Sequence, residues 1–263
     1  MRVVVLRVDG VATIQDGGRR GRMHEGIPPG GALVPPLLHR ANAALGNAID
    51  APAIEHAGKV VLRAETPARI FAGGHVIDLR AHESATIPAP LLRVDYIGME
   101  GGLDATPFLG GRGALLTLGH GRILAGRHLG AAGPARGSSG PRRPPDDLGW
   151  RDPARPIPLA FGPDPIPSGL RDTLLGASFR VSPTSDRAGT RLDGPALPFD
   201  AEPAATSQPM VAGGVQLTPS GLIVLGPDHP TTGGYPLVAV VPRAAQARIF
   251  ALRPGAALRF VAA

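Results

Sequence analysis

The sequence predicts a mainly β protein built from many short strands and a few short helices. Of its 263 residues, 37 are glycine and 30 are proline, and both residue types favour turns and interrupt helices. At the same time, 43% of the residues are hydrophobic and only 18% are charged, which is more apolar surface than a disordered chain carries. Short apolar segments between frequent turns favour a β-rich architecture over a bundle of long helices.

The N-terminal half contains apolar segments of strand length that are bounded by turn residues. Strands are expected at residues 1–9, 59–62, 68–71, 75–79 and 91–96. One helix is expected over residues 36–45, because Pro36 suits a first helical turn and Gly46 ends the apolar periodicity.

The C-terminal half has a similar set of short elements. Strands are expected at residues 179–181, 214–217, 222–225, 237–241 and 257–261. Helices are expected after Ser168 and from Pro242 to about Leu252. A spacing of two glycines after a polar turn recurs in both halves, which either an internal duplication or chance explains in a chain this rich in glycine.

Residues 130–156 mark the clearest boundary along the chain. They contain Gly-Ser-Ser-Gly and a run rich in proline and arginine, with almost no apolar residues, which is typical of a linker or long loop. We therefore expect an N-terminal domain over residues 1–129 and a C-terminal domain over residues 157–263.

The residue inventory excludes several kinds of chemistry. The sequence has no cysteine, which excludes disulfides, thiolate metal sites and cysteine nucleophiles. Its eight histidines form no H-x-x-x-H or H-E-x-x-H pair, so we expect no metal site. Lys59 is the only lysine and lies in no G-x-x-x-x-G-K-[ST] loop, and no G-x-S-x-G nucleophile turn occurs.

Charge and hydropathy exclude further partners. The 27 basic and 21 acidic residues are interspersed, and only seven Phe, two Tyr and one Trp are available for stacking on bases, so we expect no nucleic-acid partner. The first nine residues are too charged for a signal peptide, and the apolar runs are too short to span a membrane. We therefore expect a soluble, cytoplasmic protein without a membrane partner.

Two polar blocks contain many of the candidate functional residues. One is residues 13–21, Thr-Ile-Gln-Asp-Gly-Gly-Arg-Arg-Gly, and the other is residues 228–236, Asp-His-Pro-Thr-Thr-Gly-Gly-Tyr-Pro. The second block follows a predicted strand and combines hydrogen-bonding side chains with glycines, which let a ligand approach the backbone closely. A binding site and a purely structural turn both stay open for this block.

These blocks and several others occur in the order found in a known family. The chain resembles the carboxyltransferase-domain family called allophanate hydrolase subunit 2, which includes the C subunit of bacterial 5-oxoprolinase and the Kip antagonist of a sporulation-kinase inhibitor. The segments that carry the resemblance are residues 13–21, 26–32, 40–47, 53–55, 181–195, 214–217, 228–236 and 252–255. They extend over nearly the whole chain, and Thr-Thr-Gly-Gly-Tyr-Pro at 231–236 is the most specific of them.

The resemblance implies a fold and three possible functions. The implied fold is two cyclophilin-like β-barrel domains in tandem. The leading function is that of a C-type component of an ATP-dependent 5-oxoprolinase, which opens 5-oxoproline to glutamate together with a B-type (Kip inhibitor-type) protein and an A-type protein of the LamB/YcsF kind. ATP would then act through the complex. The alternatives are a carboxyltransferase acting on urea or a related amide with biotin supplied in trans, and a non-catalytic regulator that binds a B-type kinase inhibitor.

Motif matching to this family implies a set of site residues. The catalytic candidates are Asp228, Thr231, Thr232 and Tyr235. The substrate-binding candidates are Gln15, Asp16, Arg19, Asn42, Ser185, Asp186, Arg187, Gln216, Gly233 and Gly234. We expect Asp228 to orient the substrate or transfer a proton, Tyr235 and the adjacent glycine turn to contact substrate or biotin, and Arg19 or Arg187 to bind an anion.

The chain departs from the family pattern in its N-terminal half. Gly30 and Val34 stand where relatives carry Ser and Asp, and Arg127 follows Gly126 where they carry Gly-Asp. A Leu-Gly-Ser-x-Ser-Thr segment corresponds here to residues 109–114, Leu-Gly-Gly-Arg-Gly-Ala, without its three hydroxyls. These losses favour a divergent member and keep the non-catalytic alternative open.

Overall fold

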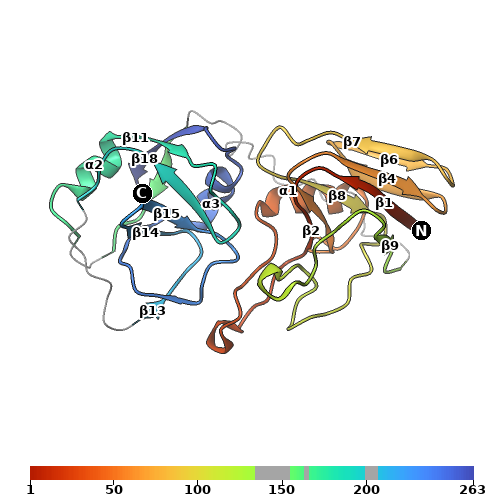
Figure 1. Ribbon diagram of the computed structural model, residues 1–263, viewed down its shortest axis with the longest axis horizontal. Coiled ribbons are helices and arrows are strands. Elements are labelled where there is room, and N and C mark those ends of the chain that lie inside the picture. Colours follow the sequence, from red (N-terminus) through yellow and green to blue (C-terminus); the bar gives the residue numbers. More distant parts are fainter. Residues whose placement is uncertain (134–154, 163–165, 199–206) are drawn as a thin grey trace. The chain divides into compact units, whose positions relative to one another are not determined.

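The computed structural model describes residues 1–133, 155–162, 166–198 and 207–263, which form two compact units (Figure 1). Within these ranges the N-terminal unit comprises residues 1–20 and 30–133, and the C-terminal unit comprises residues 21–29 and those from 155 onward. Residues 21–29, with the 3-10 turn Met23–Glu25, therefore belong with the C-terminal unit by their contacts. Most of the predicted 130–156 linker lies outside the described residues.

The N-terminal unit contains two antiparallel sheets. The four-stranded sheet has the order β7 (Ser84–Ile87), β4 (Val60–Ala64), β1 (Arg2–Val8) and β9 (His128–Gly130). The five-stranded sheet has the order β2 (Ala12–Gln15), β3 (Ala53–His56), β8 (Asp95–Met99), β5 (Ala68–Ala72) and β6 (His75–Leu79). Both sheets contribute to one hydrophobic cluster, in which Val5 and Leu62 from the first sheet join Ile54, Ile70 and Ile97 from the second.

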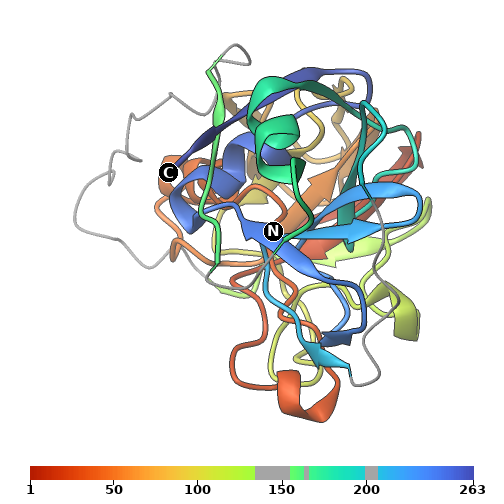
Figure 2. The ribbon, with the colours of Figure 1, turned by 90° about the vertical axis from the view of Figure 1, so that its left-hand side faces the viewer.

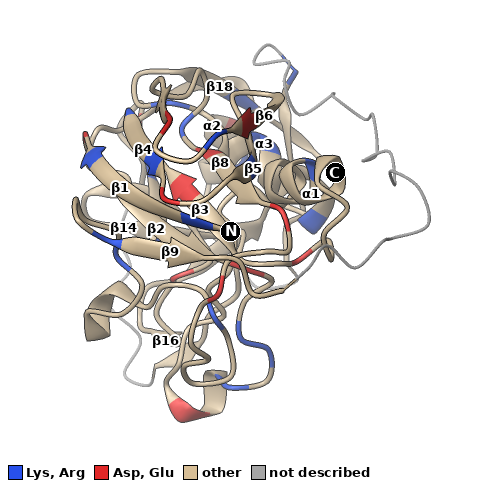
Figure 3. Cartoon of the chain, turned by 90° about the vertical axis from the view of Figure 1, so that its right-hand side faces the viewer, with Lys and Arg blue, Asp and Glu red and all other residues tan. Residues whose placement is uncertain are grey.

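Helix α1 (Pro35–Ala44) packs against β8, β5 and β3. Leu37, Leu38 and Ala41 form its buried apolar face, as the sequence predicts. Charged residues on this unit are interspersed in sign (Figure 3), and Asp9, directly after β1, forms exposed ion pairs with Arg7 of β1 and with Lys59 before β4.

The C-terminal unit is built on one seven-stranded sheet. Its strand order is β10 (Ile157–Leu159), β18 (Ala257–Ala262), β11 (Ser178–Val181), β12 (Gly189–Asp193), β15 (Gly221–Leu225), β14 (Gly214–Thr218) and β17 (Leu237–Val240). The β10–β18 pair is parallel and the other neighbours are antiparallel. A separate two-stranded ribbon pairs β13 (Gln208–Pro209) with β16 (Thr232–Gly233).

The two outer strands of this sheet meet and nearly close it into a barrel. Ala160, directly after β10, forms an antiparallel bridge with Val240 of β17, and their reciprocal N–H···O distances are 2.9 and 2.8 Å. Closure satisfies edge groups that would otherwise be exposed. Side chains alternate inward and outward on β12, where Thr190 and Leu192 are buried while Arg191 and Asp193 are exposed.

Two helices cover the C-terminal barrel. Helix α2 (Leu170–Gly176) contacts β18, the teal helix and dark-blue strand of Figure 2. Helix α3 (Arg243–Phe250) contacts β10. Among the described residues, no helix is long and apolar enough to cross a membrane.

The structure confirms the mainly β fold class and the three helices expected from the sequence. The predicted strand at residues 91–96 is wrong over its first four residues, since β8 begins at Asp95. Pro88 and Pro90 precede this segment and lack the N–H groups that a strand pairs through, and Leu91 is 91% exposed.

We expect Gly58→Ala to destabilise the N-terminal unit. A Cβ at Gly58 would collide with the backbone carbonyl of Asp9, at the turn that joins β3 to β4. Overpacking of this kind costs about 1–3 kcal/mol, to be measured by urea unfolding. Gly130→Ala is the control, because its Cβ would enter open space, and equal losses for both variants would contradict the prediction.

Candidate functional site

Two polar loops meet at one end of the C-terminal barrel. Residues 182–188 join β11 to β12, and residues 226–236 join β15 to β17. They are neighbours because β12 pairs with β15, with Gly189 opposite Leu225. The backbone links continue beyond the strands, since the N–H of Gly226 donates to Ala188 O at 2.9 Å and the N–H of Asp228 donates to Arg187 O at 3.1 Å.

Arg187 and Asp228 form a bidentate ion pair between these loops. Nε of Arg187 lies 2.7 Å from Oδ2 of Asp228, and a terminal guanidinium nitrogen lies 3.0 Å from Oδ1. The side chains are only 11% and 16% exposed, so water screens the pair weakly. Two parallel charge-assisted hydrogen bonds give a fixed orientation, and the pair therefore sets where the Asp228 carboxylate lies.

Gly226 makes this arrangement possible, although sequence analysis did not select it. A Cβ at this position would collide with the carbonyl oxygen of Arg187. The absence of a side chain thus lets the end of β15 lie directly against the 182–188 turn. Its place immediately after a predicted strand and two residues before Asp228 is the signal that could have identified it.

Ser185 and Asp186 use their side chains within their own turn. Oδ1 of Asp186 accepts from the backbone N–H groups of Ala188 and Gly189 at 2.9 and 3.0 Å. The Ser185 hydroxyl accepts from the N–H of Arg191 at 2.9 Å and lies 3.2 Å from its carbonyl oxygen. Both predicted binding residues therefore shape the turn that presents Arg187.

The Thr-Thr-Gly-Gly-Tyr segment is attached to the barrel by Gln216. Nε2 of Gln216, on β14, donates to the carbonyl oxygen of Tyr235 at 3.1 Å. Gly233 lies beside the same amide, since a Cβ there would approach Gln216 Nε2 to 3.2 Å. Thr231 and Thr232 are half-buried and exposed, and their hydroxyls make no hydrogen bond to a described residue.

His229 follows Asp228 in the 226–236 loop. It is fully buried, and its Nδ1 lies 2.6 Å from the carbonyl oxygen of Pro230. Because a carbonyl only accepts, Nδ1 carries the proton and Nε2 is an acceptor. Nε2 is buried with no partner among the described residues. Burial lowers the pKa of His229 and keeps the imidazole neutral near pH 7.

In the N-terminal unit, Gln15, Asp16 and Arg19 lie at the end of β2 and in the turn after it. Asp16 accepts from the backbone N–H of Gly18 at 2.9 Å and of Arg112 at 2.6 Å. Gln15 donates to the Thr13 hydroxyl at 3.0 Å, while its buried Oε1 has no partner among the described residues.

Arg19 is fully buried and donates to a loop distant in sequence. Its guanidinium reaches the carbonyl oxygens of Phe108, Gly113 and Ala114 at 3.2, 2.5 and 3.3 Å. This loop contains the segment that lacks the three hydroxyls. Gly113 lies against both Gln15 and Asp16, since a Cβ there would come within 2.9 Å of Gln15 Oε1 and Asp16 Oδ1. The binding roles assigned to these residues stay predictions, and the hydrogen bonds show them holding a loop to β2.

Asn42 lies at the end of α1 and fixes the following loop. Its Nδ2 donates to the carbonyl oxygens of Ile49 and Ala51 at 3.1 and 2.8 Å, and its Oδ1 accepts from Asn47 at 3.1 Å. Glu55 and Tyr96 form a buried pair that the sequence analysis did not select. The Tyr96 hydroxyl donates to the Glu55 carboxylate, which also accepts from the N–H of Leu33 at 2.8 Å.

The structure therefore brings together Arg187, Asp228 and their turn, and separately Gln216 with the Tyr235 backbone. A model of the family described as "Carboxyltransferase domain, subdomain A and B" matches residues 92–262. The chain belongs to this carboxyltransferase-domain family. The match includes all the C-terminal candidates and the loop that Arg19 contacts.

Relatives of known name agree with this assignment. The chain is 29% identical over 281 residues to the C subunit of 5-oxoprolinase from Escherichia coli (strain K12), and the match covers 98% of this chain and 90% of the relative. It is 28% identical to the protein of the same name from Haemophilus influenzae, with the same coverage. Urea amidolyase of Lachancea kluyveri is 27% identical over 95% of this chain, which corresponds to 16% of that protein.

Two solved structures show the same fold. The protein TTHA0988 superposes with a TM-score of 0.83 at 28% identity, over 99% of this chain and 56% of its own. The Kluyveromyces lactis urea carboxylase gives a TM-score of 0.85 at 21% identity, over 99% of this chain and 27% of its own. The chain thus spans about half of TTHA0988 and a smaller part of the yeast enzyme.

We expect the Arg187–Asp228 pair to stabilise the C-terminal unit measurably. A double-mutant cycle with Arg187→Ala and Asp228→Ala should give a coupling energy of about 1.5–3 kcal/mol, because the hydrogen bonds are charged and largely screened from water. The control cycle uses Arg22 and Glu25, which lie 2.9 Å apart but are each 40% exposed, and should give below about 0.5 kcal/mol. Similar coupling in both cycles would refute the structural role.

Stability should fall on mild acidification. Burial lowers the pKa of His229, and likewise of His56 in the N-terminal unit, below the ordinary value of 6.5. The unfolded chain then binds more protons below about pH 6.5, so the free energy of unfolding decreases as pH falls through that value. Urea unfolding between about pH 7.5 and 5.5 should show a shallower decrease for His229→Gln. His24→Gln, at a 76% exposed side chain, should leave the decrease unchanged.

Proposed function

We propose that this chain is a C-type component of an ATP-dependent 5-oxoprolinase and acts in a cytoplasmic complex with A-type and B-type proteins. The observation that carries the proposal is the match to the C subunit of 5-oxoprolinase over 98% of this chain and 90% of the relative. The C-terminal loops support it, because they present a fixed carboxylate at Asp228 and the two available hydroxyls of Thr231 and Thr232.

This arrangement suits the opening of a lactam. Hydrolysis of an amide needs hydrogen-bond donors at the developing oxyanion and a group that moves a proton. The threonine hydroxyls can donate, and the guanidinium of Arg187 holds Asp228 in a single orientation. We assign the catalytic contacts to Asp228, Thr231, Thr232 and Tyr235, and substrate positioning to the residues that shape their loops.

The lysine of this chain does not lie in a phosphate-binding loop of the kind that holds ATP. Lys59, the only lysine, lies directly before β4 and its Nζ is 3.3 Å from Asp9, whereas a P-loop lysine precedes a helix and faces phosphates. We therefore assign ATP binding to a partner protein of the complex.

Carboxyl transfer to urea or a related amide is the second candidate, favoured by the family match and by the urea amidolyase relative. The sequence contains no Met-Lys-Met carrier motif, so biotin would be supplied in trans. A third candidate, a regulator that binds a B-type kinase inhibitor without catalysis, is favoured by the loss of hydroxyls at residues 111, 113 and 114.

Reconstitution with cognate A-type and B-type proteins should give glutamate release that depends on both ATP and 5-oxoproline. Asp228→Ala should reduce the rate by about 100-fold or more, as loss of a proton-transfer group does, and Tyr235→Phe should reduce it less. Asp172→Ala, on the exposed side of α2, is the control and should keep full activity.

The outcomes separate the candidates. Full activity of Asp228→Ala would refute the site but not the function. No activity of the wild-type complex, with transfer of a carboxyl group from carboxybiotin to urea, would replace the leading proposal by the second. Inactivity in both assays, with stable binding to a B-type protein, would favour the regulator.

A further inference from the structure

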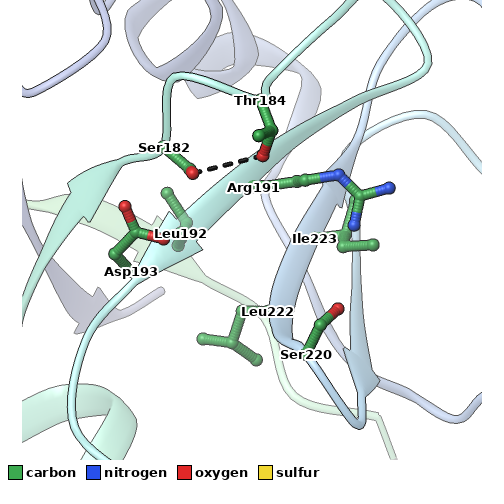
Figure 4. A pocket seen from close by; sticks show the side chains of 8 residues that line it. All are labelled: Ser182, Thr184, Arg191, Leu192, Asp193, Ser220, Leu222 and Ile223. Carbon is green, nitrogen blue, oxygen red and sulfur yellow. Dashed lines mark hydrogen bonds between the residues drawn. The ribbon is translucent and has the colours of Figure 1, made fainter.

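A pocket of about 460 Å³ opens on the outer face of the C-terminal barrel. It lies over β12 and β15, between the turn after β11 and the β14–β15 hairpin, and Figure 4 shows its lining side chains. Its volume is in the range of sites for small molecules. Ser182 and Thr184 of the 182–188 loop line it, whereas Arg187, Asp228 and the rest of the 226–236 loop do not, so the pocket shares one loop with the Asp228 site but not its ion pair.

Arg191 provides the positive group of the pocket. It is exposed on β12, directly opposite Ile223 of β15, and Figure 4 shows its side chain extending past Ile223. Its guanidinium makes no hydrogen bond or ion pair with a described residue, while its backbone is fixed on both sides by the Ser185 hydroxyl. A planar guanidinium with unused donors matches a carboxylate.

Asp193 provides a negative group in the same pocket. It is two residues from Arg191 on one strand, so both side chains leave the same face of the sheet. Its carboxylate also has no partner among the described residues. A carboxylate that lines the same pocket as a guanidinium disfavours phosphate or sulfate, because it repels a compact anion, and instead accepts from an ammonium or amide N–H.

Hydroxyl groups complete the lining. The Ser182 and Thr184 hydroxyls are 3.2 Å apart on one side, and Ser220 lies on the other. Hydroxyls both donate and accept, and Ile223 offers an apolar surface for a short aliphatic chain. We propose that this pocket binds a small amino acid-like molecule, with Arg191 on its carboxylate and Asp193 on its ammonium or amide N–H.

The proposal goes beyond the proposed enzymatic function and does not depend on it, because it concerns binding to the isolated chain. The probes are L-glutamate and 5-oxoproline, which carry a carboxylate and an N–H group, succinate, which lacks the N–H, and inorganic phosphate. Titrations followed by ¹H–¹⁵N NMR should shift the amide signals of β12 and of the 218–221 hairpin at millimolar L-glutamate or 5-oxoproline, with weaker effects of succinate and phosphate.

Three variants test the assignment of the groups. Arg191→Ala should weaken binding of the amino acid probes by about 10-fold or more, the loss expected for a charged hydrogen bond. Asp193→Asn should weaken the amino acid probes and leave succinate unchanged or bound more tightly. Arg259→Ala, another exposed arginine of the barrel, is the control and should bind as wild type does, and the NMR spectra report whether each variant folds.

Each contrary result overturns the proposal. Absence of shifts at millimolar L-glutamate and 5-oxoproline would show that the pocket is not such a site. Equal binding of phosphate and L-glutamate, both lost in Arg191→Ala, would show a simple anion site. Shifts that survive Arg191→Ala would place the ligand elsewhere.

Discussion

Buried and half-buried side chains that donate to backbone carbonyls hold the loops of this protein on their sheets. Arg19 donates to three carbonyls of residues 108–114, Asn42 to two after α1, and Gln246 to those of Ala212 and Val241. Buried backbone N–H and C=O groups need hydrogen-bond partners. Loops rich in glycine and proline do not pair as strands, so a sheet does not supply these partners. The motif segments keep a defined conformation because these side chains supply the missing donors.

The same constraint organises the candidate site of the C-terminal unit. β12 and β15 lie side by side, Gly226 allows the close approach of their loops, and the Arg187–Asp228 pair fixes the result. Most of the polar side chains of the site are thus engaged with protein, whereas the hydroxyls of Thr231 and Thr232 have no hydrogen bond to a described residue. The pocket over β12 and β15 differs in this respect. Arg191 and Asp193 line it, and their charged groups have no partner among the described residues.

The strands and helices that sequence analysis identified are those with clear apolar patterns, such as β15 and α1. The strands that it missed include the short β7, β9, β10, β13 and β16. It also missed β2, β3 and β12, which bury polar residues, among them Gln15, Glu55 and Thr190. Alternation of hydropathy is the signal for a half-buried strand, and a buried polar side chain removes it. The site was also predictable only in part. Motif matching selected Arg187 and Asp228 as separate residues, but it predicted neither their ion pair nor the role of Gly226.

By itself the sequence determined the mainly β class, the helices and the segments that carry the family motifs. Only the tertiary structure decided which motif side chains bind the protein's own backbone and which face solvent. The physical reason is that the acceptors are backbone carbonyls far away in the chain, 89 residues from Arg19 in the case of Phe108. Every residue has the same carbonyl, so no residue type at those positions marks it as a partner until folding brings the two together.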